Sequence, residues 1–469
     1  MRKLFLATAS MLFAAVTAAH AADPSPCADA TAWLKQQYDA DPATREAFDA
    51  TYQGLQPLPS GYRYGGSGDN PWKKAGGGQG LMEAMRGFYD QVCTLLPQIT
   101  GTNDNALDSI QYFAWLYYHN DAGVRLVTGI DPADPARPPL ESVRTFLIKF
   151  NQLYKQYMDS PASTGRVAEW IADPRLEMED YESRDPAFYR SWNQYFARNL
   201  RFDPASKTYP SRPVTMPDRP YVVVSPTDCI MNPLVQVVQA DPQHVRRKLV
   251  ENPLQPDTIL DVKGIPISVA QMLGDAPAEL KAKFTGGSGL ACVLMPNTYH
   301  HFHAPVDGVI RYAAIARAGT KTAFGTFGYS DWPNWVPASG DVGRPGTDFS
   351  QFQGFQRGVI VIEIRYPNLP GRQPETLTGY VASIPVGLDT VGSVVLADGV
   401  REGAHVTKGV TPLGNFFFGG SLDILLFSPI GGEAGQPQMM SPAVQTRMGN
   451  QIGILNLPYA PPKTPWTPD

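Results

Sequence analysis

The stretch Phe416-Phe417-Phe418-Gly419-Gly420-Ser421-Leu422-Asp423-Ile424-Leu425-Leu426-Phe427 decides how the second half of the chain folds. Its last six residues form a short apolar run that follows two glycines, which is typical of a buried strand that begins just after a turn. Similar short runs, bounded by Gly, Pro or Asp, occupy residues 221–224, 359–364 and 394–396. After about residue 205 the sequence therefore predicts a β-rich domain of short strands.

The first half of the chain has the period of α-helices instead. Within residues 140–158 one apolar stripe at helical spacing comprises Phe146, Phe150, Leu153, Tyr154 and Tyr157. Further helices are predicted over residues 30–52, 80–97, 105–127 and 186–200, and four prolines between Pro210 and Pro220 mark a connector. We expect an α+β protein with a helical N-terminal domain at 22–140, a helical segment and connector at 141–220, and the β-rich domain at 221–469.

The composition excludes several classes of protein. The 469 residues include 44 Pro and 43 Gly scattered without a period, which excludes long helical arrays, coiled coils and collagen. With 43% hydrophobic and 18% charged residues the chain can form a core. A net charge of −5 without a basic run offers nothing to a nucleic-acid backbone. We therefore expect a globular protein that does not bind nucleic acid.

Residues 1–21 have the features of a cleaved secretory signal. Arg2 and Lys3 precede an apolar run, and Ala19-His20-Ala21 is a small-residue cleavage site. The apolar run is shorter than a membrane-spanning helix requires. We expect an exported protein, located in the periplasm.

Four cysteines remain in the mature part: Cys27, Cys93, Cys229 and Cys292. In an oxidising compartment an even number permits disulfides. Pairing of Cys27 with Cys93 is preferred because both lie in the N-terminal region. The cysteine spacings match no zinc-binding pattern.

Three stretches of the β-rich half carry side chains suited to chemistry. Ser225-Pro226-Thr227-Asp228 places a carboxylate at the end of a predicted strand, and Gly420-Ser421 precedes another. Residues 299–308 contain three of the seven histidines, at positions 300, 301 and 303. On a strand, His301 and His303 share one face and His300 lies on the other. From spacing alone the cluster is a metal site, a proton-transfer site or a surface feature.

Taken in order, these stretches resemble the motifs of the phosphatidylserine decarboxylase family of pyruvoyl enzymes. Residues 189–200 resemble the family's Phe-Asn-x-Phe-Phe-x-Arg-x-Leu, and Ser211-Arg212-Pro213 the Arg-Pro that follows it. Ser225–Asp228 is similar to the family's Ser-Pro-x-Asp-Gly, and residues 299–305 are similar to its Tyr-His-Arg-Phe-His-x-Pro. Gly420-Ser421 falls where the family has its Gly-Ser cleavage motif. The chain departs from the family pattern at Cys229, His301 and Leu422, where Gly, Arg and Thr or Ser are usual.

The resemblance implies a self-cleaving proenzyme. The Ser421 hydroxyl attacks the carbonyl of Gly420, and the serine becomes a pyruvoyl group, so that neither pyridoxal phosphate nor a metal is needed. His303 is implied as the base and Asp228 as its partner, because a serine hydroxyl needs an oriented base. His300 is implied as the proton donor or acceptor of the later decarboxylation. The large and small chains of the cut precursor are expected to stay associated.

The family offers two classes of amine-bearing carboxylate as substrate. Conversion of phosphatidylserine to phosphatidylethanolamine is the expected reaction, with peripheral contact to a membrane. The mature chain has no polybasic patch to hold it on anionic lipid. The long helical region with its aromatic run resembles a soluble branch of the family that decarboxylates free aromatic amino acids such as tryptophan. A non-catalytic binding protein of the same fold is a more remote alternative.

Overall fold

The computed structural model describes most of the chain from residue 25 to residue 455. The described residues are 25–57, 69–96, 112–113, 115–128, 131, 137–138, 140–239, 246–250, 253–262, 265–295, 297–316, 357–388, 394–417, 420–430, 438–439 and 444–455. The predicted signal, most of the first half of the predicted helix 105–127, and the pair Phe418-Gly419 lie outside these residues.

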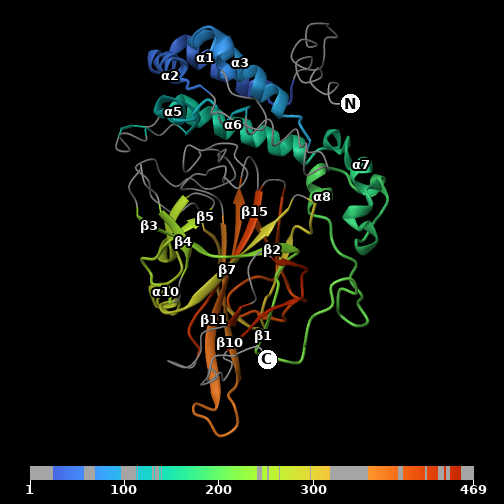
Figure 1. Cartoon of the computed structure of the whole chain (residues 1–469). Helices are drawn as coiled ribbons and strands as arrows, with labels where there is room; N and C mark the ends of the chain where they lie inside the picture. Colours follow the sequence, from blue (N-terminus) through green and yellow to red (C-terminus); the bar gives the residue numbers. More distant parts are fainter. Residues whose placement is uncertain are drawn as a thin grey trace, which may run out of the picture.

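The N-terminal part is helical, as the sequence predicts, and forms a layer at one end of the molecule (Figure 1). Its helices are α1 (Ala28–Ala40), α2 (Pro42–Gly54), α3 (Gly78–Val92), α5 (Asp121–Thr128) and α6 (Glu141–Met158). The 18 residues of α6 match the predicted stripe. Their aromatic side chains pack together, and Tyr89 contacts both Phe146 and Phe150 with ring centroids 4.8 and 4.6 Å apart.

The predicted single helix over 30–52 is wrong, because the chain breaks at Asp41. The Asp41 side chain accepts hydrogen bonds from the backbone N–H groups of Ala43 and Thr44 and caps α2, with Pro42 in its first turn. Asp and Pro at these positions are the usual signal for a helix start. The predicted disulfide is confirmed, since Cys27 and Cys93 are bonded and tie the start of α1 to the end of α3.

A linking segment of short helices connects the two halves. It contains α7 (Val167–Ala172), α8 (Trp192–Phe196) and 3-10 turns at Pro161–Thr164, Pro174–Leu176, Met178–Asp180 and Pro186–Phe188. The predicted helix over 186–200 is thus reduced to the five residues of α8. The amide of Asn193 donates to Asp159 at 2.7 Å, and the backbone N–H of Trp192 donates to Ser163 at 2.8 Å. These bonds fix α8 against the end of α6.

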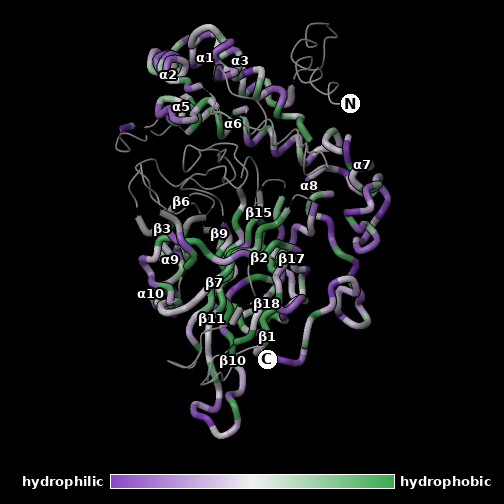
Figure 2. Tube along the Cα trace, viewed as in Figure 1, coloured by the Kyte–Doolittle hydropathy of each residue, from purple (hydrophilic) through white to green (hydrophobic). Residues whose placement is uncertain are grey.

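The second half is built on an eight-stranded antiparallel sheet with the order β13-β9-β10-β11-β15-β7-β2-β17. Its strands are β2 (Cys229–Pro233), β7 (Ser288–Leu294), β9 (Gly308–Ala316), β10 (Arg357–Pro367), β11 (Thr376–Leu388), β13 (His405–Val406), β15 (Gly420–Phe427) and β17 (Val444–Thr446). The predicted runs at 359–364 and 422–427 are confirmed as β10 and β15. Figure 2 shows that hydrophobic residues concentrate on these strands.

Smaller sheets cover both faces of the large one. Three further sheets comprise β1 (Val222–Val224), β18 (Gln451–Ile454) and β16 (Gln438–Met439); β12 (Val394–Leu396), β14 (Pro412–Phe416) and β8 (His301–His303); and β4 (Arg246–Leu249), β3 (Val235–Gln239), β5 (Ile259–Val262) and β6 (Ile265–Ser268). The first two contribute Val223 and Phe302 to one buried cluster, together with Leu425 of β15. The four-stranded sheet, with α9 (Val269–Met272) and α10 (Ala278–Ala282), covers the other face, where Ile424 lies.

The start of β15 lies at the end of the sheet that is nearest the helices. Gly420 pairs with Leu388, the last residue of β11, whereas the turn between β10 and β11 is at the opposite end of that strand. In Figure 1 this hairpin turn projects from the molecule on the side away from α1–α6. The described part of the chain contains no helix with the length and apolar composition needed to cross a membrane.

Candidate active site

Ser421 is the second residue of β15 and its side chain is buried, with 1% of the residue exposed. It lies between Leu294 of β7 and Gly387 of β11 in the sheet register. Gly387 presents no side chain beside the serine on the β11 side. The described geometry thus places the predicted cleavage pair, Gly420 and Ser421, at the beginning of a central strand.

The histidine segment is connected to β15 by two short links. Leu294, opposite Ser421, ends β7, and residues 295–299 lead from it to His300. On the other side β14 pairs with β8, the backbone N–H of Phe416 donates to the carbonyl of His300 at 2.8 Å, and three residues then lead to Gly420. The fold therefore brings the histidine segment and the start of β15 to the same end of the sheet.

Hydrogen bonds with carbonyl groups fix the proton positions of the three histidines. Because a carbonyl oxygen only accepts, the ring nitrogens that face one must carry hydrogen. His303 Nδ1 faces the Val410 carbonyl at 3.3 Å, His300 Nδ1 that of Thr298 at 2.9 Å, and His301 Nε2 that of Ala197 at 2.8 Å. In its neutral form His303 therefore has its lone pair on Nε2, which accepts from the Tyr299 hydroxyl at 3.0 Å.

Burial keeps these histidines neutral. It lowers the pKa of both His300 and His303 to about 3, and that of His301 to about 4, from an ordinary value near 6.5. The positive charge of Arg198 further lowers the pKa of His300. At neutral pH each ring can accept a proton at its unprotonated nitrogen, and none carries a charge.

Asp228 is buried and is held by Arg212 rather than by a histidine. The guanidinium donates from Nε and Nη2 to the carboxylate at 2.8 to 3.1 Å, and the backbone N–H of Met448 adds a third donor at 2.9 Å. Arg212 also pairs with Asp180 at 2.6 Å. The predicted residue is therefore present in the site as one side of a buried ion-pair network.

The Asp228 loop nevertheless touches the histidine segment through its backbone. The N–H of His303 donates to the carbonyl of Pro226 at 2.8 Å, and the hydroxyl of Thr227 donates to the carbonyl of Tyr299 at 3.0 Å. Asp228 and His303 thus lie on two segments whose backbones are hydrogen-bonded to each other. The side chain of Asp228 bonds to Arg212, and that of His303 bonds to Tyr299.

Arg198 and Tyr299 also contact the histidine segment, although the sequence alone assigns them no role. The Arg198 guanidinium lies over the rings of Tyr181 and Tyr195 and donates to the Asn297 carbonyl at 3.1 Å, which holds the loop before His300. The Phe196 ring lies against His300 with centroids 3.8 Å apart. Arg198 lies within the motif at 189–200 and Tyr299 within the motif at 299–305, which is a sequence signal for both residues. Their contacts with the histidine segment depend on the folded structure.

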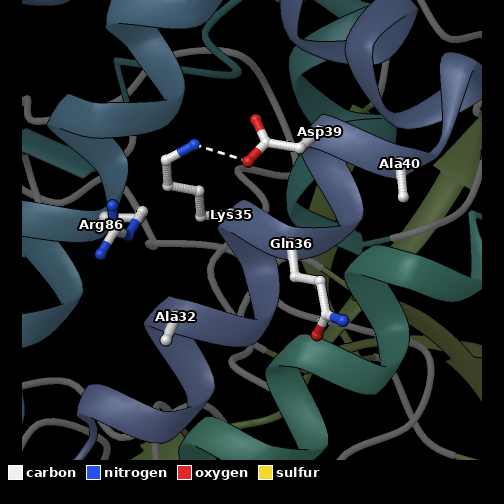
Figure 3. A pocket seen from close by; sticks show the side chains of 6 residues that line it. All are labelled: Ala32, Lys35, Gln36, Asp39, Ala40 and Arg86. Carbon is white, nitrogen blue, oxygen red and sulfur yellow. Dashed lines mark hydrogen bonds and ion pairs between the residues drawn. The ribbon is translucent and has the colours of Figure 1, made fainter.

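Three surface hollows lined by described residues include none of these side chains. Figure 3 shows one, which Ala32, Lys35, Gln36, Asp39 and Ala40 of α1 line together with Arg86 of α3. Lys35 and Asp39 form an exposed ion pair there, a type of contact that contributes little to stability. Among the described residues no group of three or more His, Cys, Asp or Glu side chains is arranged to hold a metal ion.

Comparisons with known proteins agree with this arrangement. The family model described as phosphatidylserine decarboxylase matches residues 192–454. The chain is 30% identical over 271 residues to phosphatidylserine decarboxylase proenzyme 3 of Schizosaccharomyces pombe, covering 58% of this chain but 22% of that protein. It is 27% identical to Decarboxylase iboD of Amanita muscaria, covering 56% and 67%, and 26% identical to the phosphatidylserine decarboxylase proenzyme of Clostridium novyi, covering 59% and 74%.

The chain thus spans about a fifth of the length of the first of these relatives. The match nevertheless includes Arg212, Asp228, the three histidines and Ser421, because all lie within residues 192–454. The relatives are named as decarboxylases, which are carboxy-lyases. The family model matches more than half of the residues of this chain, and the chain therefore belongs to the phosphatidylserine decarboxylase family.

Proposed function

We propose that this chain is a self-cleaving proenzyme whose Ser421 becomes the pyruvoyl group of a decarboxylase. The observation that carries the proposal is the buried serine directly after Gly420 at the start of β15, at the same end of the sheet as a neutral histidine. Gly420 fits the reaction because it has no side chain to obstruct a hydroxyl that attacks its carbonyl. Two of the relatives are named as proenzymes, which supports processing.

His303 is the proposed base of the cleavage. Its hydrogen bond to the Val410 carbonyl sets the tautomer that leaves Nε2 able to accept a proton, and burial keeps the ring neutral at physiological pH. The Tyr299 hydroxyl lies at that nitrogen and orients it. In this arrangement the proton of Ser421 passes to His303 Nε2 directly or through the Tyr299 oxygen.

Asp228 is proposed to position His303 through the backbone rather than by a side-chain hydrogen bond. Arg212 and the Met448 N–H fix the carboxylate, and Pro226 and Thr227 of the same loop hold the backbone of the histidine segment. This places Asp228 as a positioning residue. His300, whose Nδ1 donates to the Thr298 carbonyl, is proposed to accept at Nε2 the proton that the substrate ammonium gives up before its amine reacts.

A pyruvoyl ketone supplies an electron sink for the carbon that loses carbon dioxide, so the substrate must carry an amine next to a carboxylate. The residues around Ser421 fit such a group, because Gly387 adds no side chain beside it and Ser421 is buried from water. The chain's own side chains then bind the amine-bearing carboxylate, exclude water and move protons. The large and small chains are expected to stay associated, since β15 pairs along its length with β7 and β11, which precede the cut.

Phosphatidylserine is the proposed substrate, with phosphatidylethanolamine as the product. The family and the names of two relatives support it. A free aromatic amino acid such as tryptophan is the second candidate. The layer of helices α1–α6 at the Ser421 end of the sheet, with its aromatic core, favours it.

We also propose that the protein is exported. The buried disulfide between Cys27 and Cys93 supports an oxidising compartment. A periplasmic enzyme would meet phosphatidylserine at a membrane surface by peripheral contact.

The deciding experiment measures carbon dioxide released from carboxyl-labelled substrates by the purified protein. Phosphatidylserine vesicles are compared with free tryptophan, tyrosine and serine, and each reaction is repeated after borohydride treatment with substrate present. The proposal expects release from phosphatidylserine that borohydride abolishes, because reduction traps the substrate amine on the ketone. Release from tryptophan alone would establish the second candidate, and release that survives borohydride would contradict the pyruvoyl mechanism.

A further inference from the structure

A second polar side chain lies on the same face of β15 as Ser421. Side chains two residues apart on a strand point to the same face, so Ser421 and Asp423 face the same way with Cα atoms about 7 Å apart. Asp423 lies opposite Cys292 of β7 and Pro385 of β11. Farther along the strand this face carries Leu425 and Phe427, so its polar part is confined to the end that holds Ser421.

Asp423 is completely buried, and its carboxyl is held by neutral groups. The Ser383 hydroxyl lies 3.2 and 3.1 Å from its two oxygens, and the backbone N–H of Ile384 also bonds to it. In the described part of the chain no Lys, Arg or His side chain forms an ion pair with it. Burial raises its pKa to about 7, against the smaller lowering effects of Ser383 and Ile384.

An apolar residue at this position would cost less free energy than a buried carboxyl. The neighbouring residues Leu422, Ile424 and Leu425 are apolar and completely or almost completely buried, so the strand itself does not require an acid at position 423. Buried acids with shifted pKa values concentrate where proteins move protons. The location of Asp423 beside the cleavage serine therefore calls for a chemical role.

The three histidines are neutral in the resting protein. Their low pKa values mean that at neutral pH they accept protons but carry none to give as charged acids. Decarboxylation also needs a proton donor, because the carbon that loses carbon dioxide must gain a hydrogen. Among the described residues on the Ser421 face of β15, Asp423 is the one whose side chain can be protonated at that pH.

We propose that Asp423 is the acid of this site and delivers its carboxyl proton to the substrate carbon that has lost carbon dioxide. The inference rests on the proposed function. The bond between that carbon and the carboxylate breaks, carbon dioxide leaves without the electron pair, and the pair ends in the new C–H bond. Asp423 is left as a carboxylate, with Ser383 as hydrogen-bond donor, and regains its proton from water after the product leaves.

The first test compares Asp423→Asn and Asp423→Val with the wild-type protein. Self-cleavage is followed by mass, and the carbonyl of the small chain is labelled with a hydrazide. Both should match the wild type within about twofold. Carbon dioxide release from phosphatidylserine or tryptophan should fall by at least about 100-fold, which is a general acid's usual contribution. Glu363→Gln is the control, because it removes an acid from the same sheet that is paired with Arg311 and Arg365. This variant should release carbon dioxide at the wild-type rate.

The second test does not depend on activity. Infrared spectra of Ser421→Ala, which keeps one uncut chain, should show a protonated-carboxyl band that disappears between about pH 6 and pH 8. The band should be missing from Ser421→Ala/Asp423→Asn. This measurement follows the protonation of Asp423 in the uncut chain and does not require catalysis.

The outcomes separate the two proposals. Unchanged carbon dioxide release by Asp423→Asn or Asp423→Val with an intact carbonyl, or a band that does not titrate, would overturn the role of Asp423 alone. A wild-type protein without a hydrazide-reactive carbonyl would overturn the proposed function itself, and the role of Asp423 with it. Loss of release together with a normal carbonyl and a titrating band would support both.

Discussion

The hydroxyl of Tyr299 donates a hydrogen bond to Nε2 of His303, with 3.0 Å between the two atoms. The opposite nitrogen of the same ring donates to the Val410 carbonyl. The imidazole is therefore held at both ends, in the tautomer that a base needs to take a proton from a serine. Tyr299 lies just before β8 and His303 is the last residue of that strand, so the fold presents the base and its orienting group together.

Tyr299→Phe should slow self-cleavage by about two- to tenfold. The variant removes one of the two hydrogen bonds that orient His303, and one such bond contributes about 0.5–1.5 kcal/mol. The measurement is the rate at which freshly made precursor is cut, with His303→Gln as the control that should stop cleavage. Faster cleavage in Tyr299→Phe would show that the tyrosine competes with Ser421 for Nε2 and does not assist it.

Arg212→Met should destabilise the folded chain by about 3–5 kcal/mol, because it leaves the Asp228 carboxylate buried without its cation. Urea unfolding of the Ser421→Ala background, which keeps a single chain, measures the change. Arg212→Met/Asp228→Asn is the matched control and should recover part of the loss. Equal losses in the single and the double variant would mean that the ion pair itself is unimportant.

The folded protein should lose stability as the pH falls below about 6.5. The pKa values of His300, His301 and His303 are lowered to about 3, 4 and 3 in the folded state, so below pH 6.5 the unfolded chain binds protons that the folded chain does not. Each histidine lowers the free energy of unfolding by about 1.4 kcal/mol per pH unit until its folded pKa is reached. Above pH 6.5 the three histidines contribute no dependence.

Asp423 has the opposite effect, because its folded pKa is raised to about 7. It reduces stability as the pH rises from about 4 to 7, which offsets the contribution of one histidine. Urea midpoints between about pH 4 and pH 8 test this balance on the Ser421→Ala background. His301→Gln should make the acid-side slope shallower, and an unchanged slope would mean that His301 is protonated in the folded state.

Reduction of the Cys27–Cys93 disulfide should destabilise the helical layer. The bond closes a loop with a sequence separation of 66 residues, for which chain entropy gives about 4 kcal/mol. Thermal unfolding of Cys27→Ser/Cys93→Ser measures the effect. Cleavage at Gly420–Ser421 should continue at the wild-type rate below the melting temperature, because the bond lies outside the β-rich half. Loss of cleavage in a folded variant would show that the helical layer shapes the cleavage site.

The sequence predicts the periodic elements well and the side-chain partners poorly. The apolar stripe of α6 and the short runs of β10 and β15 depend on local patterns, and the pairing of Cys27 with Cys93 follows from their common region. The break at Asp41 was also local, but the helical period of the surrounding residues hid the cap. Local patterns therefore set most of the elements.

The partner of Asp228 could not be predicted, because the ion pair with Arg212 depends on how the loop and the connector meet in the folded chain. The same holds for Asp423. An acid inside an apolar strand is visible in the sequence, but its shifted pKa results from complete burial. Contacts between distant segments thus decide the electrostatics of the candidate site.

Self-cleavage between Gly420 and Ser421 is tested by the intact mass of the purified wild-type protein and of Ser421→Ala under denaturing conditions. We predict two wild-type chains, a large one ending at Gly420 and a small one of residues 421–469 whose first residue has the mass of a pyruvoyl group. Ser421→Ala should give one uncut chain. A wild-type protein that remains a single chain, or a Ser421→Ala protein that is still cut at this bond, would show that Ser421 does not cleave the chain.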